Sequence, residues 1–181
     1  MESKHDGGEK SAAVTSHRHD SPKKLKIALF TVSSSRYRDP NLDDDSGEIA
    51  KDLCQKAGHA FSHQIIDDSK PMVRLSLFKS LYENDCDATI FLGGTGLSPR
   101  DVTIEAVLPL IDKRLDGFGE IFRQLSYDSI GSAALMTRAI AGTIDSKLVY
   151  CLPGSPDAAK VGMDLVLKEL PHAVFISKSK P

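Results

Sequence analysis

Residues 88–107 read ATIFLGGTGLSPRDVTIEAV. The first five residues are apolar or β-branched, which predicts a strand that is buried on both faces, as strands of parallel sheets are. A Gly-Gly-Thr-Gly loop follows directly, and a short helix is predicted from about Val102. A buried strand followed by a glycine loop and a helix is typical of α/β folds, so this stretch decides the fold class.

The rest of the chain repeats the alternation of strand and helix. The predicted strands cover residues 25–33, 60–66 and 86–94, and two more, joined by a turn at 143–146, lie within 133–152. The predicted helices cover residues 46–59, 69–84, 117–127 and 155–170. Because crossovers between parallel strands are right-handed, this order predicts a three-layer α/β fold, with helices on both faces of a mostly parallel, doubly wound sheet.

The chain has 181 residues, of which 40% are hydrophobic, and a formal net charge of −2. This composition predicts a single domain over residues 25–176, preceded by a flexible polar tail over 1–24 and followed by a short tail over 177–181. His17 and His19 could bind a metal ion. No carboxylate or cysteine cage surrounds them, which favours a solvated segment.

Charge and cysteine content exclude several classes of protein. The near-balanced charge gives no basic face for nucleic acid. Three cysteines are widely spaced and form no Cys-x-x-Cys pair, which argues against a zinc site and against secretion. No apolar run approaches the ~20 residues that cross a bilayer, and the first residues lack the apolar core of a signal peptide. We therefore expect a cytoplasmic protein without a nucleic-acid or membrane partner.

The glycine loop suggests an anion site. Glycine at positions 93, 94 and 96 lets backbone N–H groups approach a ligand, while Thr95 and Ser98 add hydroxyl donors and a helix begins just downstream. About half of such loops are only tight turns. The loop is neither a Walker A motif nor a dinucleotide fingerprint, because the Gly-Lys-Ser/Thr ending and the G-x-G-x-x-G spacing are absent. Phosphate is the predicted ligand.

Two aspartates make the prediction more specific. Asp101 could cap the backbone at Thr103 or Ile104. Beside a phosphate loop it could instead hold Mg²⁺, which binds through one or two carboxylates and substrate phosphate oxygens. Asp68 ends the second strand and would reach the same sheet edge. This pattern predicts metal-assisted phosphoryl or nucleotidyl transfer. A receiver-like phosphoacceptor domain is disfavoured, because Gly93 stands where that design needs an aspartate.

Three segments carry a resemblance to a known family: GGTGLSPRDVTIEAVLPLID, DGFGEIFRQLSYDSIGSAALMTRAIAG and LPGSPDAAKVGMDLVLKELPHAVF. They closely resemble the MogA/MoaB-like molybdenum cofactor biosynthesis proteins, and the similarity runs from about residue 26 to about 175. The segments DDDSGEIAKDLCQKAGH and FRQLSYDSIGSAAL look more like the MoaB branch.

The resemblance implies a molybdopterin adenylyltransferase. Such an enzyme converts molybdopterin and Mg·ATP into adenylyl-molybdopterin and pyrophosphate, in preparation for metal insertion. It also implies a compact α/β fold and homo-oligomers, trimers for MogA-like and hexamers for MoaB-like members, with contact to the protein that inserts the metal. The alternatives are a non-catalytic molybdopterin-binding or assembly protein of the same fold, and a related nucleotide pyrophosphatase.

The resemblance and the chemistry together assign roles. Asp68 and Asp101 would hold Mg²⁺ and orient the attack on ATP. The remaining substrate and phosphate-binding candidates are Gly93, Gly94, Thr95, Gly96, Ser98, Arg100, Thr103, Glu120, Arg138, Pro153, Gly154 and Ser155.

Several of these candidates have simpler interpretations. Arg100 would clamp phosphate or be solvated, Ser155 would line the pocket or only cap the last helix, and Arg138 would meet phosphate or be structural. Glu120 would face the pterin or adenine ring. The acidic run over 43–45 is expected to be a solvated loop, with Asp45 capping the first helix.

Overall fold

A computed structural model of the protein describes residues 21–179. Within this range one six-stranded sheet forms the centre of the molecule. Its strands are β1 (Lys26–Val32), β2 (Ala60–Ile66), β3 (Ala88–Leu92), β4 (Lys113–Arg114), β5 (Ile140–Ile144) and β6 (Lys147–Leu152). Residues 1–20 lie outside this range, and with them the candidate metal ligands His17 and His19.

The strand order is β2-β1-β3-β6-β5-β4. β1 pairs in parallel with β2 and β3, and β3 pairs in parallel with β6, whereas β5 is antiparallel to both β6 and β4. β5 and β6 are joined by a two-residue turn in which Asp145 and Ser146 both have positive φ angles, the backbone that twisted hairpins require. The predicted mostly parallel sheet and the predicted turn are confirmed.

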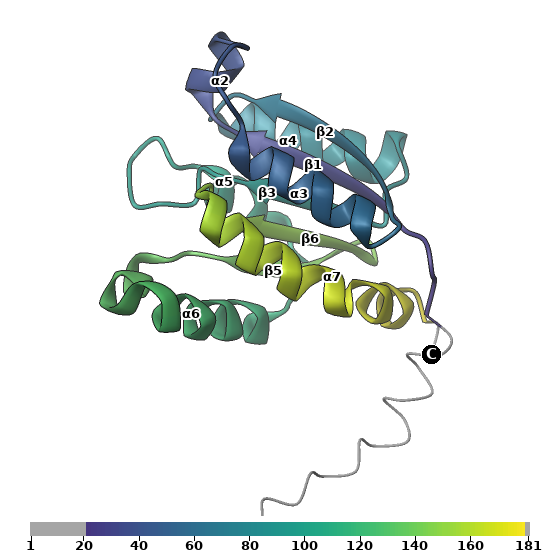
Figure 1. The fold of residues 1–181 in the computed structure, drawn as a ribbon. Coiled ribbons are helices and arrows are strands. Elements are labelled where there is room, and N and C mark those ends of the chain that lie inside the picture. Colours follow the sequence, from purple (N-terminus) through teal and green to yellow (C-terminus); the bar gives the residue numbers. More distant parts are fainter. Residues whose placement is uncertain (1–20, 180–181) are drawn as a thin grey trace, which may run out of the picture.

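Helices cover both faces of the sheet, as predicted. They are α2 (Ser34–Arg38), α3 (Asp45–Lys56), α4 (Lys70–Phe78), α5 (Thr103–Val107), α6 (Asp116–Ile130) and α7 (Pro156–Lys178). α3, α6 and α7 lie on the near side of the sheet in Figure 1, and α4 lies behind it. Two separate clusters of buried side chains match these two helix layers.

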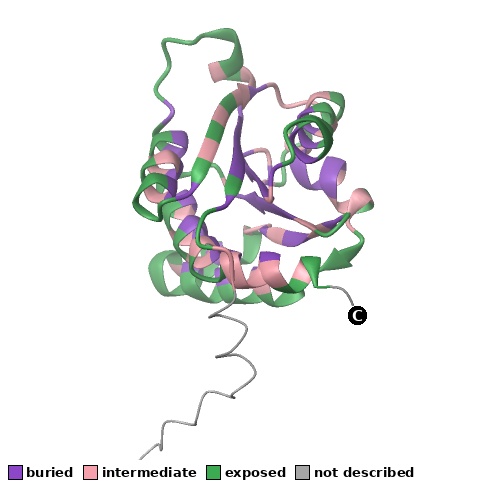
Figure 2. Ribbon diagram, turned by 90° about the vertical axis from the view of Figure 1, so that its right-hand side faces the viewer, coloured by how far each residue is buried: buried purple, intermediate pink, exposed green. Residues whose placement is uncertain are grey.

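The buried strands separate the two clusters, because successive side chains of a strand point to opposite faces. Ile27 and Leu29 pack under α3 and α7, whereas Ala28 and Phe30 pack under α4 and α5. Figure 2 shows the central strands as a buried layer between more exposed helices. No helix in residues 21–179 has the length and apolar character to span a membrane.

The structure differs from the sequence prediction in short elements and at boundaries. α2 and β4 were not predicted, and the strand expected from residue 133 begins only at Ile140, because residues Gly131–Met136 form a 3₁₀ helix. Periodicity cannot assign so short an apolar run. α7 continues past residue 170 and past the predicted domain end at 176, and its last residue, Lys178, pairs with Asp87 at 2.5 Å.

The topology places the carboxyl ends of β1, β2, β3 and β6 at one edge of the sheet. The connection from β1 leads to β2 on one side, and the connection from β2 leads to β3 on the other side of β1. Ligands of open α/β sheets bind at such a switch point, outside the carboxyl ends of the strands. The gap between the ends of β1 and β3 is therefore the expected binding position.

Candidate functional site

A cavity of about 420 Å³ lies at this edge of the sheet. Its lining brings together nine of the candidates predicted from sequence: Asp68, Gly93, Gly94, Thr95, Gly96, Asp101, Arg138, Pro153 and Gly154. The other lining residues are Val32, Ser33, Arg36, Ala133, Met136 and Thr137. The four parallel strands and the segment before β5 thus all contribute walls to one cavity.

The glycines of the loop are required by its backbone. Gly93 and Gly94 have φ angles of +104° and +62°. A Cβ atom on Gly93 would lie 2.5 Å from the carbonyl oxygen of Val32, and one on Gly94 would lie 2.3 Å from Thr103 Oγ1. On the opposite wall, a Cβ on Gly154 would lie 3.0 Å from the Cα of Gly93. The ends of β1, β3 and β6 therefore meet closely only because these positions lack side chains.

Thr103 supports the loop from behind. Its side chain is fully buried, its hydroxyl donates to the Gly93 carbonyl at 2.9 Å, and its backbone N–H donates to the Gly94 carbonyl at 2.9 Å. It is not part of the cavity lining. α5 has five residues, and its first N–H group already donates to the glycine loop. The helix end that was expected to attract phosphate therefore stabilises the loop instead.

Only one of the two carboxylate oxygens of Asp68 has a hydrogen-bond partner among residues 21–179. Its Oδ2 accepts a hydrogen bond from the backbone N–H of Ser34 at 3.0 Å, and its own N–H donates to Ser34 Oγ at 3.2 Å. Its Oδ1 is buried and has no hydrogen-bond partner among residues 21–179. Buried carboxylate oxygens are normally satisfied, and a cation would satisfy this one. Asp68 therefore fits the role of a metal ligand.

Asp101 closes the other end of the glycine loop. Its Oδ2 accepts from the Ser98 N–H at 3.1 Å, and its N–H donates to the Ser98 carbonyl at 2.9 Å. Val102, the N-cap of α5, has no side-chain capping bond, so Asp101 does not cap that helix. A Cβ on Gly96 would lie 2.8 Å from Asp101 Oδ2, so this glycine makes room for the carboxylate.

The donor set suits a metal that is shared with a phosphate. No group of three or more His, Cys, Asp or Glu side chains within residues 21–179 could hold a metal by itself. Asp68 and Asp101 line the same cavity and leave further ligand positions to phosphate oxygens and water. Mg²⁺ is bound in this way in many nucleotide sites. The residues present therefore fit Mg²⁺.

Arg138 has a structural role within the cavity wall. Its Nε donates to the Thr95 carbonyl at 2.9 Å and its Nη2 pairs with Glu105 Oε1 at 2.7 Å. Burial alone would raise the pKa of Glu105, but the hydrogen bond and charge of Arg138 outweigh it and lower that pKa. Arg138 thus ties the segment before β5 to the glycine loop, with its charge balanced by Glu105.

Five candidates lie outside the cavity lining: Ser98, Arg100, Thr103, Glu120 and Ser155. Ser155 is the N-cap of α7, with Oγ accepting from the Ala158 N–H at 3.4 Å, which confirms its capping role. Arg100 is exposed, and its N–H donates to Ser98 Oγ at 3.3 Å. Glu120 lies on α6 in a separate cavity of about 380 Å³.

The structure corrects the interpretation of the acidic run. The N-cap of α3 is Asp44, whose Oδ1 accepts from the Gly47 N–H at 3.1 Å, so the expectation that Asp45 caps this helix is wrong. Asp44 is buried, not solvated. Burial would raise its pKa, but hydrogen bonds from His63, Thr31, Gly47 and Ser46 outweigh it and hold the pKa well below the usual range.

Sequence reasoning also missed Arg36. This arginine lines the cavity from α2. It directly follows the run Ser33–Ser35 at the end of β1, and its place at a strand's carboxyl end is the signal that could have found it.

Comparison with known proteins gives a consistent result. The molybdenum cofactor biosynthesis protein B of Bacillus cereus is 40% identical over 166 residues, which cover 90% of this chain and 96% of that protein. A Methanocaldococcus jannaschii protein named probable molybdopterin adenylyltransferase is 39% identical over 158 residues, which cover 85% of this chain and 94% of that protein.

Solved structures agree with these relatives. The crystal structure of the tungsten cofactor synthesizing protein MoaB from Pyrococcus furiosus matches with a TM-score of 0.80 at 36% identity, covering 87% of this chain and 99% of that one. The family described as "probable molybdopterin binding domain" matches residues 28–172. The resemblance seen in the sequence is confirmed. The chain belongs to the probable molybdopterin binding domain family, among its MoaB-like members.

Proposed function

We propose that this protein acts in molybdenum cofactor biosynthesis as a molybdopterin adenylyltransferase that uses Mg·ATP. The observation that carries the proposal is the meeting of two carboxylates, Asp68 and Asp101, with the glycine loop in one cavity. The unpartnered Oδ1 of Asp68 supports a cation there. Family membership supports molybdopterin as the substrate, and the name of the Methanocaldococcus relative supports adenylyl transfer.

The proposed reaction is a displacement at the α-phosphorus of ATP. A terminal phosphate oxygen of molybdopterin, already anionic at neutral pH, forms the new P–O bond. The bond between the α-phosphorus and the bridging oxygen to the β-phosphate breaks, and its electron pair leaves with pyrophosphate. No proton has to be removed from the attacking group, so the protein's tasks are to position the phosphates and to stabilise charge.

The residues of the cavity divide these tasks. The N–H groups of residues 94–96 and the Thr95 hydroxyl would hold phosphate oxygens, since glycine backbones allow close approach, whereas the Gly93 N–H already donates to the Leu152 carbonyl. Asp68 and Asp101 would hold Mg²⁺. When bound, the ion would neutralise phosphate charge and stabilise the transition state. Pro153 and Gly154 would close the opposite wall.

Release of pyrophosphate tests the proposal. The purified protein is mixed with molybdopterin and Mg·ATP, and pyrophosphate and adenylyl-molybdopterin are quantified. We expect both products in equal amounts. Binding of molybdopterin without release of pyrophosphate would instead identify a non-catalytic binding or assembly protein. Hydrolysis of nucleotide in the absence of molybdopterin would identify a pyrophosphatase.

We also propose that the chain assembles with copies of itself. Large apolar side chains are exposed along α6 and the following 3₁₀ helix, beside the cavity: Ile121, Leu125, Ile130, Leu135 and Met136. Leu135 is 85% exposed, and Met136, 59% exposed, also lines the cavity. Exposed apolar surface of this kind favours a protein interface, and the family resemblance favours a second copy of this chain as the partner.

A substitution in this surface tests the assembly. Leu135→Asp is expected to lower the molecular mass in solution to that of the monomer, because it places a charge in the interface without touching the core. Light scattering coupled to size-exclusion chromatography gives the mass. Leu75→Asp, at an exposed apolar position of α4, is the control and should leave the mass unchanged. A monomeric wild type, or a Leu135→Asp variant of wild-type mass, contradicts the proposal.

A further inference from the structure

The structure contains an arginine whose charge is not balanced within residues 21–179. Arg36 Nε donates to the backbone carbonyl of Asp43 at 2.6 Å, and its Nη1 lies 3.5 Å from Ser33 Oγ. No carboxylate pairs with its guanidinium in the described range. The same side chain lines the cavity that holds Asp68 and the glycine loop. Arg138 differs, because Glu105 balances its charge.

The chemistry of such a group favours a phosphate ligand. A guanidinium presents five N–H donors in a planar fork that matches phosphate oxygens, and it stays charged at any physiological pH. The contacts with Asp43 and Ser33 orient the fork and leave donors for a ligand. The two acceptors, a carbonyl oxygen and a hydroxyl oxygen, carry no net charge, so they leave the positive charge of Arg36 unbalanced, whereas a carboxylate would balance it. The guanidinium of Arg36 is therefore oriented and charged, and no carboxylate among residues 21–179 balances its charge.

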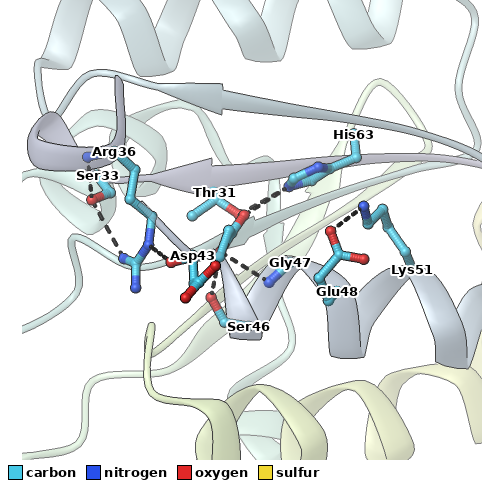
Figure 3. Close-up of polar contacts among 10 residues, drawn as sticks. Thr31, Ser33, Arg36, Asp43, Ser46, Gly47, Glu48, Lys51 and His63 are labelled. Carbon is cyan, nitrogen blue, oxygen red and sulfur yellow. Dashed lines mark hydrogen bonds and ion pairs between the residues drawn. The ribbon is translucent and has the colours of Figure 1, made fainter. Parts of the chain in front are cut away.

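The carbonyl that orients Arg36 is itself firmly held through the next residue. Asp44 Oδ2 accepts from Thr31 Oγ1 at 2.6 Å and lies 3.2 Å from His63 Nε2. Its Oδ1 accepts from Ser46 Oγ and from the Gly47 N–H, each at 3.1 Å. Thr31 belongs to β1, His63 to β2, and the other two to α3, so three elements fix one carboxylate. Figure 3 labels Thr31, His63, Ser46 and Gly47 beside the Arg36–Asp43 hydrogen bond.

The fit around this carboxylate is tight. A Cβ on Gly47 would lie 2.2 Å from Asp44 Oδ2 and 2.7 Å from His63 Nε2. The side chains of Asp44 and Thr31 are buried. A fully hydrogen-bonded buried carboxylate has little freedom to move, and neither has the peptide group before it. The position of the Asp43 carbonyl, and with it that of Arg36, is therefore set by Asp44.

We propose that Arg36 binds a phosphate group in the cavity and that Asp44 positions Arg36 by fixing the Asp43 carbonyl. The inference rests on the proposed function and deepens it, because it adds a cationic group to the same phosphate site. Arg36 touches the ligand, whereas Asp44 acts through Arg36.

Binding of pyrophosphate tests the role of Arg36. Isothermal titration calorimetry of the full-length protein with pyrophosphate and Mg²⁺ needs no molybdopterin. Arg36→Met is expected to weaken binding at least ~10-fold, because hydrogen bonds from a charged donor to phosphate are lost. Arg36→Lys should recover part of the affinity, since it restores the charge without the fork. Arg38→Met, on the exposed side of α2, is the control and should bind as the wild type does.

A double-mutant cycle tests the role of Asp44. Asp44→Asn is expected to weaken pyrophosphate binding several-fold when Arg36 is present and to have no further effect in the Arg36→Met background. A general loss of structure would weaken binding in both backgrounds. Equal effects of Asp44→Asn in the two backgrounds overturn the positioning role. Circular dichroism of each variant shows whether the fold is kept.

The results separate this inference from the proposed function. Loss of pyrophosphate affinity on Arg36→Met, in a protein that releases no pyrophosphate from ATP and molybdopterin, supports the Arg36 site and rejects the transferase. Normal turnover with unchanged pyrophosphate affinity in Arg36→Met rejects the Arg36 site alone. A wild-type protein that does not bind pyrophosphate also overturns the inference.

Discussion

Replacing Asp101 with asparagine is expected to lower the turnover of molybdopterin adenylylation by at least ~100-fold, since removing a charged group that stabilises the transition state costs a few kcal/mol. Asparagine keeps the size of the side chain, and its amide oxygen can still accept the Ser98 N–H, which lies 3.1 Å from Asp101 Oδ2. The loop should therefore keep its shape while the charge available to Mg²⁺ is lost. Pyrophosphate release under saturating Mg·ATP measures the effect.

Two further measurements make this result specific. The affinity for molybdopterin should change much less than turnover, because the substitution leaves the glycine loop in place. Asp164→Asn, which breaks an exposed ion pair with Lys160 on α7, should retain wild-type turnover. Wild-type turnover in the Asp101→Asn variant would remove Asp101 from the reaction and leave it a role in loop structure only.

Replacing Gly94 with alanine is expected to reduce both stability and activity. The φ angle of +62° strains an alanine by about 1–2 kcal/mol. The new methyl group would lie 2.3 Å from Thr103 Oγ1 and 3.0 Å from Asp68 Oδ1. Thr103 cannot turn away without breaking its bond to the Gly93 carbonyl. Overpacking of this kind adds about 1–3 kcal/mol, for a total of about 2–5 kcal/mol in the free energy of unfolding.

Gly58 provides a matched control for this substitution. Its φ angle is +77°, and a Cβ atom there would meet nothing within 4 Å. Gly58→Ala should therefore be destabilised only by the backbone strain of about 1–2 kcal/mol and should keep its activity. Gly94→Ala should also lose pyrophosphate release, because Asp68 is displaced. Chemical denaturation gives the two free energies. Equal destabilisation of the two variants would show that the contacts with Thr103 and Asp68 are not as close as described.

The fold could be predicted because strands such as β3 and β6 are apolar runs and because glycines follow α3 and β3. Residues 88–92 and the glycines after them define both a buried strand and the cavity that follows it. Topology predicts that Asp68 and Asp101 reach one cavity, since the carboxyl ends of parallel strands share one edge, whereas their roles were assigned from chemistry and the family resemblance together. The two-residue β4 and the five-residue α2 have too few positions to show a period.

The rest of the site depends on contacts that sequence distance hides. Asp44 stands in an acidic run that is typical of a solvated loop, and its contacts with Thr31 and His63, on two different strands, cannot be read from that run. Arg36 lies four residues after the end of β1 and Arg100 eight residues after the end of β3, so sequence position does not separate them as candidates. The two arginines differ in their surroundings, because Arg36 lines the cavity whereas Arg100 is exposed on the loop.

The contact between Gly93 and Gly154 has a consequence for how this protein can vary. Most crowded pairs tolerate substitution, since a larger residue on one side can be offset by a smaller one on the other. Here the Cα of Gly93 already lies 3.0 Å from where a Cβ on Gly154 would stand, and no smaller residue exists for either position. A change at one of them has no compensating partner. The two cavity walls therefore stand as close together as backbones allow, and both positions must remain glycine to keep them there.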